Sequence, residues 1–129
     1  MDNTVLVDSC VFITLLKDRR DPNRTLFEWA AGRQLATCGM VKMEVLRGLK
    51  EPTLHKKIKR FLDVFIYVPT NNKLWEQATE LAWQLDRKGI VLPAQDILIA
   101  TCALHLGAAV LSFDQHFQLI PNLKVYDKL

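Results

Sequence analysis

Three aspartates interrupt segments of the chain that are otherwise apolar. Asp8 follows a run of three apolar residues, Asp96 precedes a run of four, and Asp114 ends the segment that begins at residue 110. A buried carboxylate without a partner is costly. Each of these aspartates must therefore cap a helix, form an ion pair, reach solvent or bind a cation. A cation bound by such acids would be able to take part in catalysis.

Each acid has an ordinary structural explanation when it is considered alone. Asp8 is suited to cap a helix after a strand, Asp96 to the positive end of a helix dipole, and Asp114 to a turn. Glu44 can be an exposed residue of a helix. Their combination is more informative. Asp8 and Asp114 both follow predicted strands. Asp96 begins a predicted helix, and Glu44 lies on a helix that follows a strand, so we expect all four acids to converge at one edge of a sheet.

Convergence of these acids would concentrate negative charge. Neighbouring carboxylates raise one another's pKa unless a hard divalent cation balances them, and ligation by oxygen alone favours magnesium or manganese. We expect Asp8, Asp96 and Asp114 to bind the metal and Glu44 to join them in catalysis. The three histidines share no metal-ligand spacing, which argues against zinc. For His116, two residues beyond Asp114, we expect a structural or surface role.

The elements that must position these acids alternate between strands and helices. Short apolar runs predict the strands, and apolar residues at helical spacing predict the helices. Parallel strands need crossover connections, which are usually helices, and ligands bind beyond the carboxyl ends of such strands. We therefore predict an α/β fold with a mostly parallel central sheet. The predicted strands are 4–7, 35–38, 66–68, 108–111 and 124–126, and the predicted helices are 11–16, 24–31, 40–49, 53–65, 72–88 and 94–106.

The composition fits one compact domain over residues 1–129, because half of the residues are hydrophobic. A net charge of +3 and a pI near 8.8 are compatible with a nucleic-acid partner but do not establish one. Three widely spaced cysteines suit neither a disulfide framework nor a zinc site, so we expect reduced, partly buried thiols. No apolar run is long enough to span a bilayer, and the amino terminus lacks the basic region of a signal peptide. We expect a cytoplasmic protein with no membrane partner.

Four short segments around the acids occur in an order that is typical of one family. They are Val7-Asp8-Ser9 after a strand, residues 44–48 (Glu-Val-Leu-Arg-Gly), residues 93–100 (Pro-Ala-Gln-Asp-Ile-Leu-Ile-Ala), and Ser112-Phe113-Asp114, followed by Phe117 as the expected anchor of a loop. Together these segments resemble the PIN-domain family. The Glu-x-x-x-Gly and Asp-x-x-Ile-Ala contexts are similar to those of the VapC-type toxins of toxin–antitoxin pairs. The similarity covers essentially the whole chain.

The resemblance implies a single PIN-like domain, with a mostly parallel central sheet sandwiched by helices and an acidic pocket that holds Mg²⁺ or Mn²⁺. It also implies endonucleolytic cleavage of RNA. By the same resemblance, the acidic positions of the family match Asp8, Glu44, Asp96 and Asp114, and the small hydroxyl residues that support them match Ser9 and Ser112.

Two positions depart from the family's pattern. Gly39 stands where many relatives carry a serine or threonine, which leaves the hydrogen bonding around Glu44 open. Phe113 is bulkier and less polar than expected beside Asp114, and we expect it to shape the entry of substrate. Neither departure removes an acidic residue.

The expected reaction is hydrolysis of an RNA phosphodiester by a metal-activated water, which leaves a 5′-phosphate and a 3′-hydroxyl. Lys42 and Arg47 are candidate contacts for RNA phosphates, although a solvated side chain is the default for such residues. No histidine pair supports a metal-free route through the 2′-hydroxyl. Trp29, Trp75 and Trp83 have helical spacings that favour core or dimer packing over base stacking.

The resemblance also implies partners. A small VapB-like antitoxin would cover the acidic pocket, often with a basic side chain, and the nuclease would be a homodimer. Contact with DNA would be indirect, through the antitoxin complex. The RNA target stays open among transfer, ribosomal and messenger RNA.

Three other functions share part of the sequence pattern of a toxin nuclease. A phosphatase of the haloacid dehalogenase type also places an aspartate after its first strand, but it needs a second aspartate where this chain has Cys10. A non-catalytic PIN module that binds RNA or protein would be marked by lost acids, whereas all four are present. A housekeeping RNA-processing PIN nuclease would share the active site, so only gene context separates it from a toxin.

Overall fold

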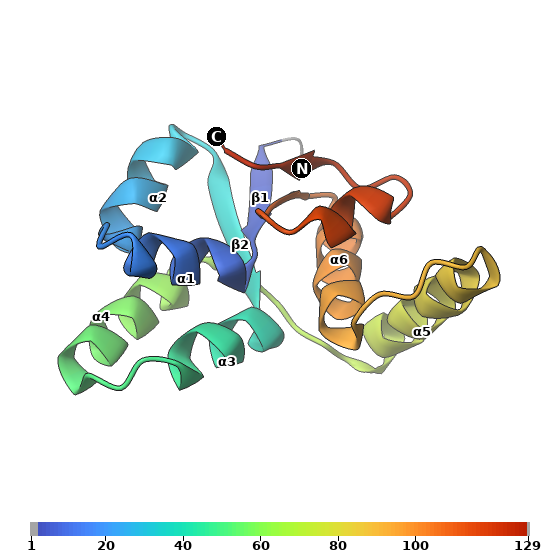
Figure 1. Cartoon of the computed structure of the whole chain (residues 1–129), viewed down its shortest axis with the longest axis horizontal. Helices are drawn as coiled ribbons and strands as arrows, with labels where there is room; N and C mark the ends of the chain where they lie inside the picture. Colours follow the sequence, from blue (N-terminus) through green and yellow to red (C-terminus); the bar gives the residue numbers. More distant parts are fainter. Residues whose placement is uncertain (1–2, 129) are drawn as a thin grey trace.

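The computed structural model describes residues 3–128 of the chain, and Figure 1 shows how its elements are arranged. Five strands form one sheet in the order β3-β2-β1-β4-β5, and each neighbouring pair is parallel. The sheet is therefore wholly parallel, where a mostly parallel one was predicted. The strands are β1 (Thr4–Val7), β2 (Gln34–Cys38), β3 (Ile66–Val68), β4 (Ala109–Leu111) and β5 (Val125–Tyr126).

Strand β1 lies at the centre of the sheet, and all four of its residues are buried. A strand that is covered on both faces is a continuous apolar run, as here, and does not alternate with polar residues. Val5 pairs with Leu35 of β2 and with Ala109 of β4. At the other end of β1, the backbone N–H of Asp8 donates to the carbonyl of Leu111, at 2.9 Å. This register brings the residues that follow β1 and β4 to the same edge of the sheet.

Helices lie on both sides of the sheet (Figure 1). The helices α1, α2 and α4 gather on one side and contact one another through α1·α2 and α2·α4, while α5 packs on α6 on the other side. Helix α3 contacts both α4 and α6. The helices are α1 (Ser9–Lys17), α2 (Pro22–Ala30), α3 (Gly39–Arg47), α4 (Pro52–Asp63), α5 (Asn72–Arg87) and α6 (Ala94–Leu106), with a 3₁₀ helix η1 (Gln115–Leu119) before β5.

The helix boundaries follow from local sequence signals. Asp21 and Glu51 cap α2 and α4, each with a proline in the first turn, and Asn71 caps α5 through Leu74 N. Helix α6 begins after Pro93 and ends at Gly107, whose φ of 71° is a left-handed conformation that glycine adopts without strain. These caps agree with the boundaries that the sequence predicted.

Helix α6 is the most deeply buried helix, because it packs against α5, α3 and β4. Every residue from Ile97 to Ala103 is buried, which explains why its apolar residues show no single stripe. Phe117 of η1 is also fully buried and anchors the segment after β4. The first turn of α6, which carries Asp96, is therefore held on a rigid element.

The predicted order of strands and helices is confirmed, and so is the α/β fold of a PIN-like domain. Of the predicted core or dimer packing of the tryptophans, core packing is wrong for Trp75 and Trp83, which are 49% and 55% exposed, and dimer packing stays a prediction for these two, while Trp29 packs against the core. Their helical spacing reflects an amphipathic helix without showing which face is buried. The three cysteines are free thiols, of which Cys38 and Cys102 are buried. Across residues 3–128, no helix has the length and apolar character needed to cross a membrane.

Candidate metal and catalytic site

Asp8 is held at the carboxyl end of β1 with both carboxylate oxygens in hydrogen bonds. Its Oδ1 accepts from the backbone N–H of Ser9 at 2.8 Å, which caps α1, and its Oδ2 accepts from the hydroxyl of Ser112 at 2.8 Å. The residue is only 4% exposed. The capping role that the sequence suggested is thus present, and Ser112 connects Asp8 to the segment after β4.

Glu44 faces Asp8 from α3. The hydroxyl of Ser9 donates to Glu44 Oε1 at 3.2 Å. Because Gly39 has no hydroxyl group, the sequence left the hydrogen-bond donor to Glu44 open. In the structure this donor is the hydroxyl of Ser9 in α1. Burial raises the pKa of Glu44, and the negative charges of Asp8 and Asp96 raise it further, against the opposing hydrogen bond from Ser9.

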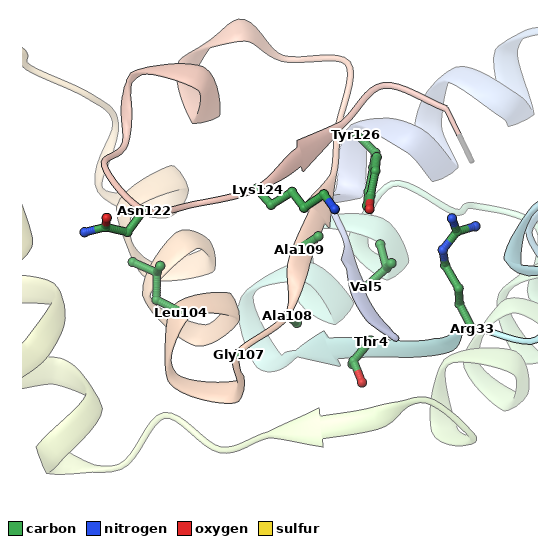
Figure 2. A pocket seen from close by; sticks show the side chains of 10 residues that line it. All are labelled: Thr4, Val5, Arg33, Leu104, Gly107, Ala108, Ala109, Asn122, Lys124 and Tyr126. Carbon is green, nitrogen blue, oxygen red and sulfur yellow. The ribbon is translucent and has the colours of Figure 1, made fainter. Parts of the chain in front are cut away.

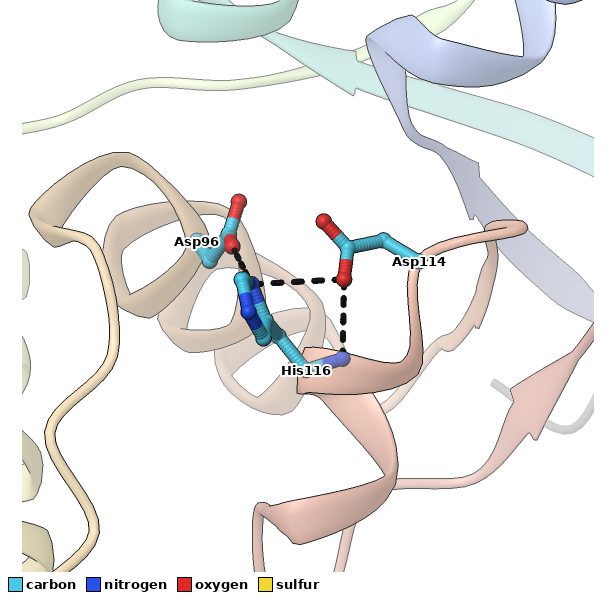
Figure 3. Close-up of side chains that lie close together, drawn as sticks. All are labelled: Asp96, Asp114 and His116. Atoms are coloured by element: carbon cyan, nitrogen blue, oxygen red, sulfur yellow. Dashed lines mark hydrogen bonds and ion pairs between the residues drawn. The ribbon is translucent and has the colours of Figure 1, made fainter.

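Asp96, Asp114 and His116 form the tightest cluster of the site (Figure 3). His116 Nδ1 lies 2.7 Å from Asp96 Oδ2 and 3.2 Å from Asp114 Oδ1. Asp114 also caps η1, since its Oδ1 accepts from the backbone N–H of His116 at 2.9 Å. One oxygen from each aspartate and one ring nitrogen of His116 all lie within 4.8 Å of one another.

The charges in this cluster shift the pKa values of two of its members. Burial is the largest cause that raises the pKa of Asp96, and Asp114 and Asp8 add to it, while the contact with His116 opposes the rise. The hydrogen bond with Asp96 raises the pKa of His116. Negative charge is therefore in excess, and the site favours the binding of a positive group.

Ser112 joins the two sides of the site. Its hydroxyl donates to Asp8 and accepts from the backbone N–H of Asp114 at 3.0 Å. Cys10 Sγ lies 3.3 Å from Ser112 Oγ and accepts from the backbone N–H of Phe113 at 3.4 Å. Burial raises the pKa of the Cys10 thiol to about 11, so the thiol keeps its proton at neutral pH and can donate to Ser112.

All four predicted acids lie in one connected network at the carboxyl edge of the sheet. Ser9 connects Asp8 with Glu44, and Ser112 connects Asp8 with Asp114. The tightest group of possible ligand atoms differs from the predicted metal set of Asp8, Asp96 and Asp114, because it holds His116 in place of Asp8. The metal-binding role of each acid stays a prediction.

Two residues of the site were not assigned to it from the sequence. His116 was expected to be structural or at the surface, although its position two residues after Asp114 was a usable signal. For Cys10 the sequence predicts a reduced, partly buried thiol, which is confirmed, but it gives this thiol no place in the site. It follows Asp8 by two residues and therefore lies in the first turn of α1, where its thiol reaches the segment after β4.

The two candidate RNA contacts lie on α3 with Glu44. Lys42 Nζ pairs with Asp63 Oδ1 of α4 at 2.8 Å, and it lies over the ring of Tyr67 at 5.7 Å from the centroid. Arg47 is in the last turn of α3, and its positive charge weakly opposes the burial that raises the pKa of Glu44. Phe113, expected to shape the entry of substrate, is 39% exposed beside a pocket that it lines with Asp114 and His116.

The donor set fits a hard divalent cation. Carboxylate oxygens predominate, one imidazole nitrogen lies among them, and burial together with the neighbouring carboxylates raises the pKa of Glu44 and of Asp96. Oxygen ligands suit magnesium and manganese, and an imidazole is compatible with manganese and other transition metals. The carboxylates of Asp96 and Asp114 would hold the ion with Asp8 beside them, and His116 Nδ1 lies against both of the first two carboxylates.

Comparison with known families identifies the fold to which this site belongs. The sequence model of the family described as PIN domain matches residues 5–123, a range that contains all four acids. The chain belongs to the PIN-domain family. The predicted resemblance is confirmed, and the α/β architecture is that of a PIN domain.

One group of PIN-domain proteins is particularly similar to this chain. Ribonuclease VapC21 of Mycobacterium tuberculosis, in two strains, is 30% identical over 89 residues, which are 67% of this chain and 64% of that protein. The aligned region is thus less than two thirds of the relative's length. The similarity to VapC-type proteins is confirmed.

Solved structures share the same fold. VapBC2 from Rickettsia felis, bound to a DNA fragment from its promoter, matches with a TM-score of 0.78 and 22% identity over 95% of this chain and 97% of that chain. DNA-bound VapBC from Salmonella typhimurium matches with a TM-score of 0.78 and 19% identity over 95% of this chain and 96% of that chain. At these identities the likeness concerns the fold.

Proposed function

We propose that this protein is a metal-dependent endoribonuclease and that Asp8, Glu44, Asp96 and Asp114 are its catalytic residues. The observation that supports the proposal most strongly is the network of four acids, from four different segments, at the carboxyl edge of a parallel sheet. Ligands bind at this edge in such folds. The name of the relative Ribonuclease VapC21 supports RNA as the substrate.

The metal is Mg²⁺ or Mn²⁺ in this proposal, held by Asp8, Asp96 and Asp114. Such an ion supplies Lewis acidity and lowers the pKa of a bound water. Ser112 fixes the carboxylate of Asp8 through its hydroxyl. His116 holds the carboxylates of Asp96 and Asp114 in one orientation through Nδ1.

Glu44 is the residue best suited to accept a proton from the attacking water. Its pKa is raised by burial and by neighbouring carboxylates, which makes it a stronger base than an exposed glutamate. Ser9 orients its carboxylate. The water attacks the phosphorus in line with its bond to the 3′ oxygen. That bond breaks and the 3′ oxygen takes up a proton, which leaves a 5′-phosphate and a 3′-hydroxyl. Lys42 and Arg47 are proposed to contact RNA phosphates.

The biological role that we propose is that of the toxin in a toxin–antitoxin pair. Similarity to a VapC ribonuclease supports this role, and so does a fold shared with VapBC proteins that were solved with DNA. The partner would be a VapB-like antitoxin that covers the acidic site, and DNA would be contacted only through that complex. A single domain over residues 1–129, a homodimer and a cytoplasmic location complete the proposal.

Inducible expression in bacteria tests the proposed activity. Wild type is compared with Asp8→Asn and Asp96→Asn, and new RNA ends are mapped by a method that requires a 5′-phosphate. Asn can still cap α1 at position 8, so that variant preserves the start of the helix. We expect growth arrest and new 5′-phosphate ends with wild type alone. Equal arrest by all three proteins, with the same RNA ends, would overturn the nuclease proposal.

A further inference from the structure

A second pocket lies at the opposite end of the sheet from the carboxylates. It has a volume of about 370 Å³ and is lined by the start of β1, the turn from α6 into β4, and side chains next to β2 and β5. We call it the amino-edge pocket, defined by Thr4, Val5, Arg33, Ala109, Lys124 and Tyr126 (Figure 2). Thr4 begins β1 and Asp8 follows its end, so about 13 Å of strand separates the two sites.

A backbone turn after α2 places Arg33 at this pocket. Ala31 and Gly32 have φ values of 45° and 90°, and this left-handed pair turns the chain from α2 so that Arg33 precedes β2. The backbone N–H of Arg33 donates to the carbonyl of Ala30 at 2.9 Å. Arg33 is half-buried and its position is set by this turn.

Lys124 and Tyr126 reach the pocket from the last strand. They are two residues apart along β5 and its approach, so their side chains leave the same face of the strand. The carbonyl of Lys124 accepts from the backbone N–H of Val110 at 2.9 Å, which ties this segment to β4. The pocket is therefore built on ordered strand ends.

Two cations meet around one aromatic ring in this pocket. Arg33 Cζ lies 5.6 Å and Lys124 Nζ lies 5.1 Å from the centroid of Tyr126, and Figure 2 shows them on either side of the ring. The hydrogen bond with Lys124 lowers the pKa of Tyr126, and the charge of Arg33 adds to the effect. The pocket is lined by no carboxylate, and no ion pair of Arg33 or Lys124 is formed within residues 3–128.

Arg33 and Lys124 lie on either side of the Tyr126 ring, and neither forms an ion pair within the described residues, so both charges can attract an anion at the edge of this ring. A phosphate monoester carries a charge of about −1.5 to −2 at neutral pH, which matches the two cations better than a carboxylate does. The guanidinium of Arg33 can bind two phosphate oxygens at once, and Lys124 supplies a point charge.

The remaining walls and the size indicate more than an inorganic ion. Leu104 contributes apolar surface, the almost fully buried Val5 and Ala109 form the floor, and Asn122 contributes an amide at the rim. A volume of about 370 Å³ lies at the lower end of the range for small-molecule sites. We propose that the amino-edge pocket binds a phosphorylated small molecule of nucleotide size, with its phosphate against Arg33 and Lys124 at the edge of the Tyr126 ring and its body on the apolar wall.

Adenosine monophosphate is a suitable probe, and a chelator in the buffer prevents metal from attracting phosphate to the carboxylates. The readout is the shift of backbone amide resonances in the full-length protein. We expect shifts at Gly107, Ala109 and Asn122 and none at Ser9 or Glu44, whereas the amide of Ser112 is no control because it donates to the carbonyl of Tyr126 at 2.9 Å. Shifts confined to the carboxylate end, or no saturable shift, would overturn the proposal. Because no metal and no RNA cleavage are involved, this result is independent of nuclease activity.

Matched variants separate a specific pocket from general attraction to a basic protein. Arg33→Gln combined with Lys124→Gln removes the two cations of the pocket. Lys56→Gln combined with Arg60→Gln removes two exposed cations from α4 and makes the same change in net charge. We expect affinity for adenosine monophosphate to fall at least about tenfold in the first pair, as loss of charge-assisted hydrogen bonds implies, and to be unchanged in the second.

Two further outcomes would contradict the proposal. An equal loss of affinity in both pairs would mean that binding reports only net charge. Inorganic phosphate is expected to bind more weakly than adenosine monophosphate, since it lacks a body to contact Val5 and Leu104. Equal binding of the two would reduce the pocket to a simple anion contact and overturn the claim for a small molecule.

Discussion

His116 Nδ1 lies 2.7 Å from Asp96 Oδ2, and this contact joins the 3₁₀ helix after β4 to the first turn of α6. The two residues are twenty positions apart in the chain. Asp96 lies on a buried helix, whereas His116 is 45% exposed at its side chain. The exposed residue can therefore exchange its proton with solvent while the carboxylate keeps its position.

Metal affinity is expected to rise with pH more steeply in wild type than in His116→Gln. The pKa of His116 is raised by its hydrogen bond with Asp96, so the protonated ring competes with a metal for the aspartates until pH exceeds that raised value. Calorimetric titration with Mn²⁺ from about pH 6 to pH 8 measures the slope. His55→Gln, on α4, is the control. Equal slopes in wild type and His116→Gln would show that the imidazole does not compete with the metal.

Glu44→Gln is expected to stabilise the metal-free protein at mildly alkaline pH while it abolishes RNA cleavage. A carboxyl group whose pKa is raised on folding contributes stability below its unfolded pKa and loses it as pH rises through the folded pKa. The melting temperature of the variant should exceed that of wild type by a few degrees in alkaline buffer. The gap should close near the usual glutamate value of 4.5.

Glu76→Gln, at an exposed position of α5, is the matched control for this stability change. It should leave the melting temperature close to that of wild type at both pH values, because surface substitutions are usually small in effect. If Glu44→Gln melted below wild type in alkaline buffer, burial beside the carboxylates of Asp8 and Asp96 would be the wrong explanation for the raised pKa of Glu44.

Ser112→Ala is expected to lower both stability and catalysis. The change removes the hydroxyl that donates to Asp8 Oδ2 and accepts from Asp114 N, and it leaves a buried carboxylate oxygen without that donor. Such a loss costs about 1 to 3 kcal/mol of the free energy of unfolding. Chemical denaturation measures the change. Thr79→Ala, which removes an exposed hydroxyl bound to the carbonyl of Trp75, should cost much less, and an equal cost would contradict this role for Ser112.

Added Mn²⁺ is expected to raise the melting temperature of wild type and to have little effect on Asp96→Asn. Binding to the folded state alone stabilises a protein by about 2.7 kcal/mol when the free ligand is at one hundred times its dissociation constant. Asp86→Asn, at an exposed position of α5, should respond as wild type does. An unchanged shift in Asp96→Asn would mean that the ion binds elsewhere.

The strands and helices could be predicted because each carries a local signal. β1 is a run of buried, mainly β-branched residues that ends at Asp8, and α6 is bounded by Pro93 and Gly107. A wholly parallel sheet follows from the helical crossovers between strands. Their order in the sheet was not predicted, because pairing of β1 with both β2 and β4 depends on contacts between distant segments.

The acids of the site could also be predicted, since each follows a strand or begins a helix. The contacts among them could not be predicted. The Ser9 hydroxyl that supports Glu44 comes from a different helix, and Cys10 meets Ser112 across 102 positions of the chain. The spacing of His116 to the other histidines is uninformative, whereas its position two residues after Asp114 places it in the first turn of η1.

The exposed aromatic residues show a limit of periodicity. Trp75 and Trp83 recur at helical spacing, yet the buried face of α5 is made by Leu74, Ala78 and Leu85. Helix α5 has two neighbouring stripes of residues, and each stripe contains apolar side chains. Only the packing of α5 on α6 decides which stripe is buried.

Cleavage of one defined RNA by the purified full-length protein tests the central claim most directly. The rate is measured with Mg²⁺ or Mn²⁺, then with excess chelator, and again after the metal is restored, with Asp96→Asn in parallel. The four-carboxylate site predicts cleavage that stops with chelator, returns with metal and is absent in Asp96→Asn. Cleavage by wild type that continues at the same rate in chelator would contradict it.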